Sequence, residues 1–211
     1  MSRAGVAEAA RAVATSQQIP DLLEQGSTAV VRMLDVTAGV AYLPNVDEVA
    51  RRAALGLGAV TQMDLLDALM GLPAGLPVPV GDLTDRERRI IRRAPAGVVD
   101  VSAGQCTRRV VAPVSAQFVV VASRSWKEGL RSAGQFAPFC SRAMLLRSVP
   151  EDLDDARVQA SFFGIGICVF TSVGLRMLVD PQPYVRQRHS CGQWWFAEKL
   201  YEQVNASEFA G

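Results

Sequence analysis

The sequence has few of the side chains on which metal sites and nucleophilic active sites depend. Its 211 residues include a single histidine, His189, and no two cysteines form a C-x-x-C pair. A structural zinc site needs about four nitrogen or sulfur ligands around one ion, so we predict neither a metal site nor a cofactor. We expect free, buried thiols, as in a reducing cytosol, at all four cysteines: Cys106, Cys140, Cys168 and Cys191.

Lysine is almost absent, and arginine carries nearly all of the positive charge. Only Lys127 and Lys199 are lysines, and the formal net charge is +1. This balance creates no overall field that draws the chain to nucleic acid or to a membrane. The excess of arginine over lysine is also typical of a GC-rich genome, so an arginine cluster by itself is weak evidence for function.

No uninterrupted apolar run is long enough to cross a bilayer, which takes roughly 20 residues. The closest stretch, residues 160–179, is interrupted by glycines and by Arg176, and it predicts two buried strands joined by a turn near 171–174. The N-terminal segment contains Glu8 and Arg11 and does not resemble a signal peptide. We therefore expect a soluble, cytoplasmic protein with no membrane partner.

Three common catalytic or nucleotide-binding motifs are also missing. The sequence has no G-x-S-x-G, the strand-to-helix turn that holds a nucleophilic serine. It has neither a P-loop nor a G-x-G-x-x-G that opens a helix after a strand. A lone histidine is more often a surface or packing residue than a general base, so no catalytic triad is predicted.

Helix-start signals are the clearest pattern that is present. In a capping box, a polar N-cap residue accepts a hydrogen bond from the backbone three residues on, where Glu or Gln reaches back. The spacing occurs at Asn45–Glu48, Thr84–Glu87, Ser125–Glu128 and Ser190–Gln193, and in a looser form at Ser148–Glu151. It predicts helices that begin near residues 46, 85, 126, 150 and 191.

The first third of the chain favours helices. Apolar residues recur at helical spacing over 19–34, although a strand at 28–34 is also compatible with the pattern. Helices over 46–55 and 63–69, separated by glycines, permit a helix-turn-helix pair. The run GLPAGLPVPVGD at 71–82 is the best linker candidate. We predict a helical N-terminal region, 1–80, followed by an α/β domain, 83–211.

Beyond residue 82 the predicted elements follow a defined order. A helix over 85–94 precedes strands near 97–101, 107–112 and 118–122. A helix from Trp126, with apolar residues recurring every three and four positions, leads to a strand over 143–146. The remaining segments are a helix over 150–160, strands over 165–170 and 175–179, and a helix over 191–203. The order is α-β-β-β-α-β, with α-β-β-α appended.

This order over residues 84–180 resembles the core of the restriction-endonuclease-like superfamily, the PD-(D/E)XK nucleases. The segment QFVVVASRSWKEGLRSAGQFAPFCSRAMLLRSVP is similar to that family's strand, crossover helix and next strand, and FGIGI to its glycine-flanked late strand. The resemblance implies a mixed sheet flanked by helices. In the family, an Asp at one strand start and an acid-x-Lys pair on the next strand hold magnesium, which activates the attacking water.

Carried over to this chain, the family's Asp falls near residues 115–117 and its acid-x-Lys pair near 120–123, where the sequence has neither an acid nor a lysine. The resemblance therefore implies a member that has lost metal-dependent cleavage. One relocated set stays open, with Asp100 on a strand and Lys127 and Glu128 at the start of the crossover helix. Glu128 also has a structural role there, as the capping partner of Ser125.

Basic and hydroxyl side chains can still hold an anion where the strand 118–122 meets the following helix, because the amides that open a helix favour anions. The candidate anion-binding or nucleic-acid-binding residues are Ser123, Arg124, Lys127, Arg131, Arg186, Arg188 and His189. A second basic group consists of five arginines between residues 86 and 93. This group is either a solvated helix face or a set of phosphate contacts.

From these features we predict a non-catalytic protein of nuclease-like fold that acts in DNA-associated binding or protein assembly. Its candidate partners are DNA, another protein or a second copy of the chain. Three consecutive aromatic residues, 194–196, offer one contact surface. Two alternatives stay open: an active metal-dependent nuclease with relocated acids, and a small-ligand sensor of the GAF-like type.

Overall fold

The computed structural model describes residues 3–16, 20–171, 174–185 and 189–208. The chain divides into two compact units that interleave in sequence. Unit 1 comprises Met1–Pro44 and Ser115–Arg186, and unit 2 comprises Asn45–Val114 and Gln187–Gly211. Neither unit is one continuous segment, whereas the sequence predicts a division near residues 71–82, which lie within unit 2.

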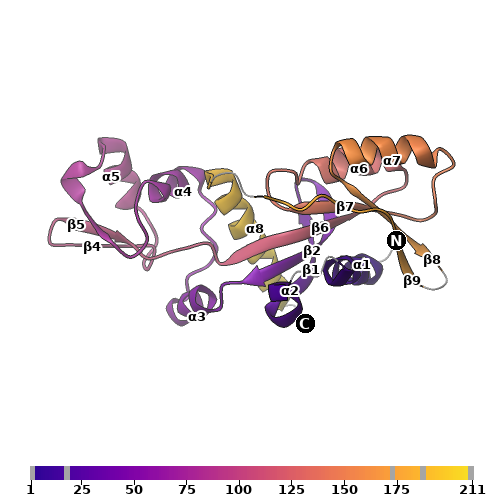
Figure 1. Cartoon of the computed structure of the whole chain (residues 1–211). Coiled ribbons are helices and arrows are strands. Elements are labelled where there is room, and N and C mark those ends of the chain that lie inside the picture. The colour runs from indigo at the N-terminus through magenta and orange to yellow at the C-terminus, as the bar shows by residue number, and fades with distance from the viewer. Residues whose placement is uncertain (1–2, 17–19, 172–173, 186–188, 209–211) are drawn as a thin grey trace. The chain divides into compact units, whose positions relative to one another are not determined.

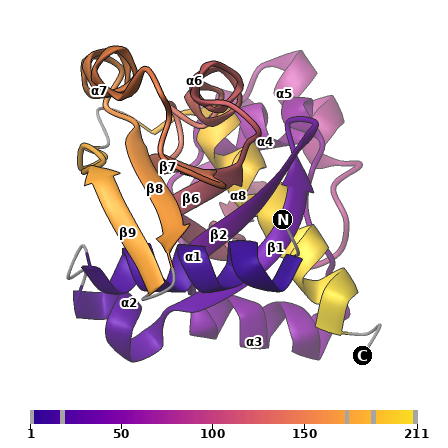
Figure 2. The ribbon, with the colours of Figure 1, turned by 90° about the vertical axis from the view of Figure 1, so that its right-hand side faces the viewer.

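Unit 1 is built on a mixed sheet with the strand order β1-β2-β6-β7-β8-β9 (Figure 2). β6, β7 and β8 are parallel, and antiparallel hairpins close both ends of the sheet. The mixed α/β architecture predicted from the sequence is confirmed at this level. The elements of unit 1 are α1 (Arg3–Ser16), α2 (Pro20–Gln25), β1 (Ser27–Met33), β2 (Val36–Pro44), β6 (Val114–Ala122), α6 (Trp126–Gly134), β7 (Ser141–Leu146), α7 (Leu153–Phe162), β8 (Gly166–Thr171) and β9 (Gly174–Val179).

Helices cover both faces of this sheet, with α1 and α2 on one side and α6 and α7 on the other (Figure 1). The small residues Ala9 and Ala10 let α1 lie close to the strands, where Phe118 and Val120 of β6 complete the buried cluster. On the opposite face, Gly129 of α6 lies against Met144, because a Cβ there would stand 2.6 Å from the Met144 sulfur. The sheet is therefore buried between two helical layers.

The hairpin β1–β2 corrects the prediction of a helical region over residues 1–80, and it confirms the strand at 28–34 that the sequence left open as an alternative. Met33 pairs with Val36, so the turn consists of Leu34 and Asp35 alone, both with positive φ, 51° and 59°. This is the geometry of a type I′ turn, in which Asn-Gly is favoured. β2 forms because it is paired on both edges, and Gly39 lets α1 approach, since a Cβ there would stand 2.6 Å from the Val6 carbonyl oxygen. Local spacing cannot reveal such tertiary pairing.

Unit 2 has a hydrophobic core of its own. Helices and a small antiparallel sheet with the strand order β3-β5-β4 pack around this core. The prediction that strands near 97–101 and 107–112 lead to the strand 118–122 in one meander is wrong. β4 and β5 have only four residues each; β4 is mostly exposed, and β5 buries Cys106 alone, in the core of unit 2. The elements are α3 (Val46–Leu55), α4 (Met63–Met70), β3 (Pro77–Pro79), the 3-10 turn η1 (Val80–Asp82), α5 (Asp85–Ile91), β4 (Val99–Ser102), β5 (Gln105–Arg108) and α8 (Cys191–Glu208).

Capping signals located the helix starts well. α3, α5, α6 and α8 begin at residues 46, 85, 126 and 191, as predicted, and Thr84 with Glu87 forms a complete capping box. The looser signal at 148–151 is displaced, since α7 begins at Leu153 after Asp152, which makes no side-chain cap. The difference arises because Glu151 and Asp152, after Pro150, form a turn before the helix begins.

β8 and β9 confirm the two strands predicted within residues 160–179. The centre of the predicted turn, 172–173, lies outside the described residues. Within the described part of the chain, no helix has both the length and the apolar character required to cross a bilayer. Cys106, Cys140 and Cys168 are buried free thiols, and Cys191 is partly exposed.

Candidate functional site

The joint between β6 and α6 is held by two capping interactions. The Ser125 side chain accepts a hydrogen bond from the Glu128 amide at 3.3 Å, as the capping signal predicts. The Glu128 carboxylate reaches back one residue further, to the Arg124 amide at 3.2 Å. A carboxylate in this position is stabilised by the positive end of the helix dipole. The Glu128 carboxylate thus occupies the position at the α6 N-terminus where an external anion would otherwise bind.

A pocket of about 470 Å³ lies at this joint, within unit 1. The parallel strands β6 and β7 bring their carboxyl ends to one edge of the sheet. β2 runs opposite to β6, because Asn45, just after β2, donates its amide hydrogen bond to Pro113, just before β6, at 2.8 Å. The start of β2 therefore joins the same edge. The polar residues of this β6–α6 pocket include Asp35, Thr37, Ser123, Arg124, Glu128 and Arg147.

Charges of both signs line the β6–α6 pocket without pairing. Asp35 and Glu128 supply two carboxylates, and Arg124 and Arg147 supply two guanidinium groups. Among the described residues, none of these four side chains takes part in an ion pair. The four groups come from the β1–β2 turn, the start of α6 and the end of β7. The formal charges of these four side chains therefore cancel, and no ion pair among the described residues neutralises any one of them.

Ser123 adds a buried hydroxyl to the pocket. The residue is 7% exposed, and its Oγ has no hydrogen-bond partner among the described residues. Its backbone amide is fixed by a hydrogen bond to the Leu145 carbonyl at 3.0 Å. An unpaired buried hydroxyl costs about 1–3 kcal/mol, so a ligand that reached this group would gain from it.

The pocket does not fit the magnesium centre that the nuclease resemblance implies. That centre needs an acid-x-Lys pair at the end of β6, where Val121, Ala122 and Ser123 stand. Across the described residues, no group of three or more His, Cys, Asp or Glu side chains could hold a metal ion. The two carboxylates that do line the pocket share it with two guanidinium groups, whose positive charge opposes the binding of a divalent cation.

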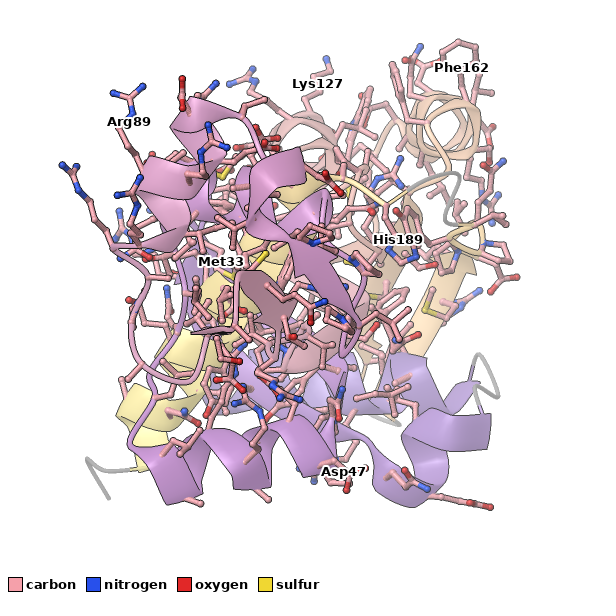
Figure 3. All side chains as sticks on the ribbon, turned by 90° about the vertical axis from the view of Figure 1, so that its left-hand side faces the viewer. Met33, Asp47, Arg89, Lys127, Phe162 and His189 are labelled. Atoms are coloured by element: carbon pink, nitrogen blue, oxygen red, sulfur yellow. The ribbon has the colours of Figure 1, made fainter. Side chains whose placement is uncertain are left out.

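The predicted site residues on α6 divide between the pocket and the open surface. Ser123, Arg124 and Glu128 line the pocket. Lys127 and Arg131 are exposed and lie outside its lining. The Lys127 ammonium lies 5.2 Å from the centre of the Trp126 ring and projects outward from the helix (Figure 3).

The other predicted residues belong elsewhere. Asp100 lies on β4 in unit 2, where its carboxylate pairs with Arg109 at 2.6 Å. The relocated set of Asp100, Lys127 and Glu128 therefore divides between the two units. His189 is exposed in unit 2. Arg186 and Arg188 lie outside the described residues.

Asp35 and Arg147 are the pocket residues that the sequence does not reveal. Asp35 would stand out as an acid at a strand start only if residues 36–44 were first recognised as a strand. Arg147 follows the predicted strand 143–146, and its place beyond the end of a parallel strand was the available signal, since such positions gather at one sheet edge.

A second pocket, of about 390 Å³, lies between α4 and α5 in unit 2. Three exposed arginines of α5 and the turn that follows it, Arg86, Arg89 and Arg93, line it together. Their spacing of three and four residues places them on one helix face, and Arg89 projects away from the unit (Figure 3). None of the three forms an ion pair among the described residues, whereas Arg88 pairs with Asp85.

The start of α4 forms the opposite side of this α4–α5 pocket. Gln62 precedes the helix and makes no side-chain cap, and the only acid in the lining, Asp64, accepts a hydrogen bond from the Leu65 amide at 2.9 Å. The positive end of the α4 dipole therefore adds to three guanidinium groups. Of the five arginines predicted from the sequence, three line this pocket. One of these three, Arg89, also donates from Nε to the Asp85 carbonyl of its own helix at 3.2 Å.

A third charged group, around Arg52, is structural. Its guanidinium donates to both carboxylate oxygens of Glu198, at 2.7 and 2.8 Å, to Glu48 at 2.6 Å and to the Val111 carbonyl at 3.0 Å. Glu198 also accepts from the Val60 amide and from the Trp194 indole. Both Arg52 and Glu198 are fully buried. Every charge is paired, so the network leaves no group for a ligand.

The two surface pockets differ in character: one is balanced and contains an unpaired hydroxyl, and the other is strongly basic. Among the described residues that line them, neither pocket has a recognisable catalytic set. Comparison with protein-family models, curated proteins and solved structures returned no match.

Proposed function

We propose that this chain is a non-catalytic protein that binds the phosphate backbone of DNA through the α4–α5 pocket. The observation that carries the proposal is the set of three guanidinium groups on one helix face, lining one pocket without a carboxylate partner. Arginine forms paired hydrogen bonds to phosphate oxygens. The amides at the start of α4 add further donors.

The packing of α5 supports this role. Ile91 is buried and Ile90 packs against the unit 2 core, which fixes the opposite, arginine-bearing face toward solvent. Contacts of this kind bind phosphates and carry no base sequence information. The overall charge of +1 does not oppose the proposal, because a local basic face is sufficient for a few backbone contacts.

The nuclease-like core is part of the same proposal, with a revised assignment of strands. We take β1, β2 and β6 as the three-strand meander, α6 as the crossover helix and β7 as the parallel fourth strand. Asp35 then stands at the start of the second strand, and the acid-x-Lys pair is missing from the third. This loss supports a binding protein in preference to a nuclease.

The first prediction compares two arginines of the same helical segment. Arg89→Gln removes a pocket arginine, and Arg92→Gln removes an exposed arginine outside the pocket lining. Affinity for a duplex of about 20 base pairs is measured by fluorescence anisotropy between about 50 and 200 mM NaCl. We expect Arg89→Gln to weaken binding and to lower the slope of log affinity against log salt by about 0.9, the value for one phosphate contact.

Arg92→Gln should leave that slope unchanged. Equal effects of the two variants, or no binding by the folded protein at low salt, would refute the proposal. Incubation of the duplex with Mg²⁺ or Mn²⁺ tests the non-catalytic part, and we expect no cleavage. Cleavage that disappears in both Asp35→Asn and Glu128→Gln would establish the alternative of an active nuclease with relocated acids.

A further inference from the structure

We propose that the β6–α6 pocket binds a small zwitterion of the amino-acid type, with one anionic and one ammonium group. Binding there is independent of DNA binding, because all the pocket residues belong to unit 1 and the proposed DNA contacts belong to unit 2. The juxtaposition that carries the proposal is two carboxylates, two guanidinium groups and an unpaired buried hydroxyl around one pocket.

The balance of charges selects the ligand class. A simple anion would meet Arg124 and Arg147 but would also face Asp35 and Glu128, and Glu128 already occupies the anion position of the α6 N-terminus. A simple cation would meet the carboxylates together with both guanidinium groups. A zwitterion can place its anionic group against a guanidinium group and its ammonium group against a carboxylate. It also leaves the net charge of the pocket unchanged, because its own net charge is zero.

Ser123 gives the pocket a fixed polar anchor. Its hydroxyl can donate to a ligand carboxylate or phosphate, and the backbone that carries it belongs to the β6–β7 ladder. A preorganised donor costs little ordering on binding. The carboxyl ends of parallel strands, where Ser123 and Arg147 stand, are also where small ligands bind in open α/β sheets.

The size of the pocket sets the scale of the ligand. A volume of about 470 Å³ lies in the lower part of the range for small-molecule sites, about 300–1,000 Å³. It accommodates a molecule as large as an amino acid with a long side chain. Thr37 at the rim supplies a further hydroxyl.

Asp35 is held at this rim by an unfavourable backbone conformation. Leu34 and Asp35 both have positive φ, which disfavours residues other than glycine by about 1–2 kcal/mol each, less for Asp. Asn-Gly would relax the turn and remove the carboxylate. The turn therefore offers two matched variants. Asp35→Gly relaxes the backbone and removes the carboxylate, whereas Leu34→Asn relaxes the backbone and keeps it.

The test is isothermal titration of the full chain with each of the standard amino acids and with phosphoethanolamine. We expect saturable binding of at least one of these zwitterions. Each one that binds is compared with two analogues, one without its ammonium group and one without its carboxylate or phosphate. Both analogues should bind at least about tenfold more weakly, the loss expected for one hydrogen bond between charged groups.

Four variants locate the site. Asp35→Gly and Arg147→Gln should each weaken binding about tenfold or more, and Asp35→Gly should raise the melting temperature as it does so. Leu34→Asn should relax the turn with the carboxylate kept, and Arg131→Gln removes an exposed arginine of α6 outside the pocket. Both of these variants should bind as the parent does.

Three results would overturn the proposal: no saturable binding of any of these zwitterions, equally tight binding of the acid or amine, or unchanged affinity in Asp35→Gly and Arg147→Gln. The Arg89→Gln variant should retain zwitterion binding. Failure of this proposal is thereby distinguished from failure of the DNA-binding proposal.

Discussion

Arg52 shows how a single residue can determine the core of unit 2. A fully buried guanidinium is costly unless each donor has a partner, and here two carboxylates and a backbone carbonyl supply them. The Tyr201 ring lies 5.3 Å from its central carbon and adds a cation–π contact. Arg52 therefore ties α3 to α8 and to the loop before β6.

Glu198→Gln should destabilise unit 2 by about 3 kcal/mol, because it leaves the Arg52 charge short of one carboxylate inside the core. The free energy of unfolding from urea titration gives the measurement. Glu202→Gln, on the exposed face of the same helix, is the control and should change stability by less than about 1 kcal/mol. A double replacement, Arg52→Met with Glu198→Leu, should cost less than Glu198→Gln. A larger loss in the double variant would contradict this account.

Local and distant residues differed in how far the sequence could predict them. Ser125 and Glu128 are three positions apart, so their contact follows from helix geometry. Arg52 and Glu198 are 146 positions apart, and nothing near either residue signals the other. The β6–α6 pocket combines both cases, since Ser123 and Arg124 were identified at the joint and Asp35 came from a distant hairpin.

At the scale of elements, α3 illustrates how a helix start can determine a response to pH. Asn45 caps the helix, and Glu48 in its first turn bonds to Arg51 and Arg52. Burial raises the pKa of Glu48, but the hydrogen bonds and charges of the two arginines outweigh it and lower the pKa below 4.5. Asp47, one position earlier, points away from the helix (Figure 3).

Because the pKa of Glu48 is lowered on folding, its contribution to stability is fully present above the ordinary pKa of a glutamate, and it is lost as the pH falls through the lower pKa of the folded state. We expect Glu48→Gln to be less stable than the parent near neutral pH and the gap to narrow in acid. Urea unfolding over this pH range provides the measurement, with Asp47→Asn as the exposed control. A gap that stays constant down to about pH 2 would contradict the linkage.

Elements with strong local signals were predicted, and those that depend on tertiary pairing were not. α5 has its complete capping box and β6 its continuous apolar run, so both follow from short segments. β2 includes Gly39, which lets α1 approach, and Ala38, which points to the opposite face of the sheet; both residues weaken any strand signal. β4 largely coincides with the predicted strand 97–101, whereas β5 shares only residues 107 and 108 with the predicted strand 107–112. Both strands belong to a different sheet from the predicted one, because strand propensity does not specify a partner.

At the scale of the whole molecule, two separate cores share one interleaved chain. Each unit contains at least one buried cysteine that can serve as a probe of its unfolding. Cys140 and Cys168 belong to unit 1, and Cys106 belongs to unit 2. Burial raises the pKa of the Cys140 and Cys168 thiols to about 12, which keeps them protonated and unreactive in the folded state. Each thiol becomes reactive only when its own unit opens.

Pulsed alkylation across a urea gradient, read by mass spectrometry at each cysteine, should therefore resolve the two units. In Glu198→Gln, Cys106 should react at lower urea than in the parent, and Cys140 and Cys168 should keep their midpoints. A common shift of all three midpoints would show that the units unfold as one.

The long separation of Arg52 and Glu198 also bears on synthesis. The ribosome adds about 5–20 residues per second, so the separation of 146 positions between the two partners corresponds to about 7 to 30 s of synthesis. During that interval α3 has been synthesised, and the Arg52 guanidinium lacks its ion-pair partner Glu198. The core of unit 2 cannot close before α8 arrives, so a nascent chain stays open there to chaperones and proteases while α1, the hairpin and β6 can already assemble.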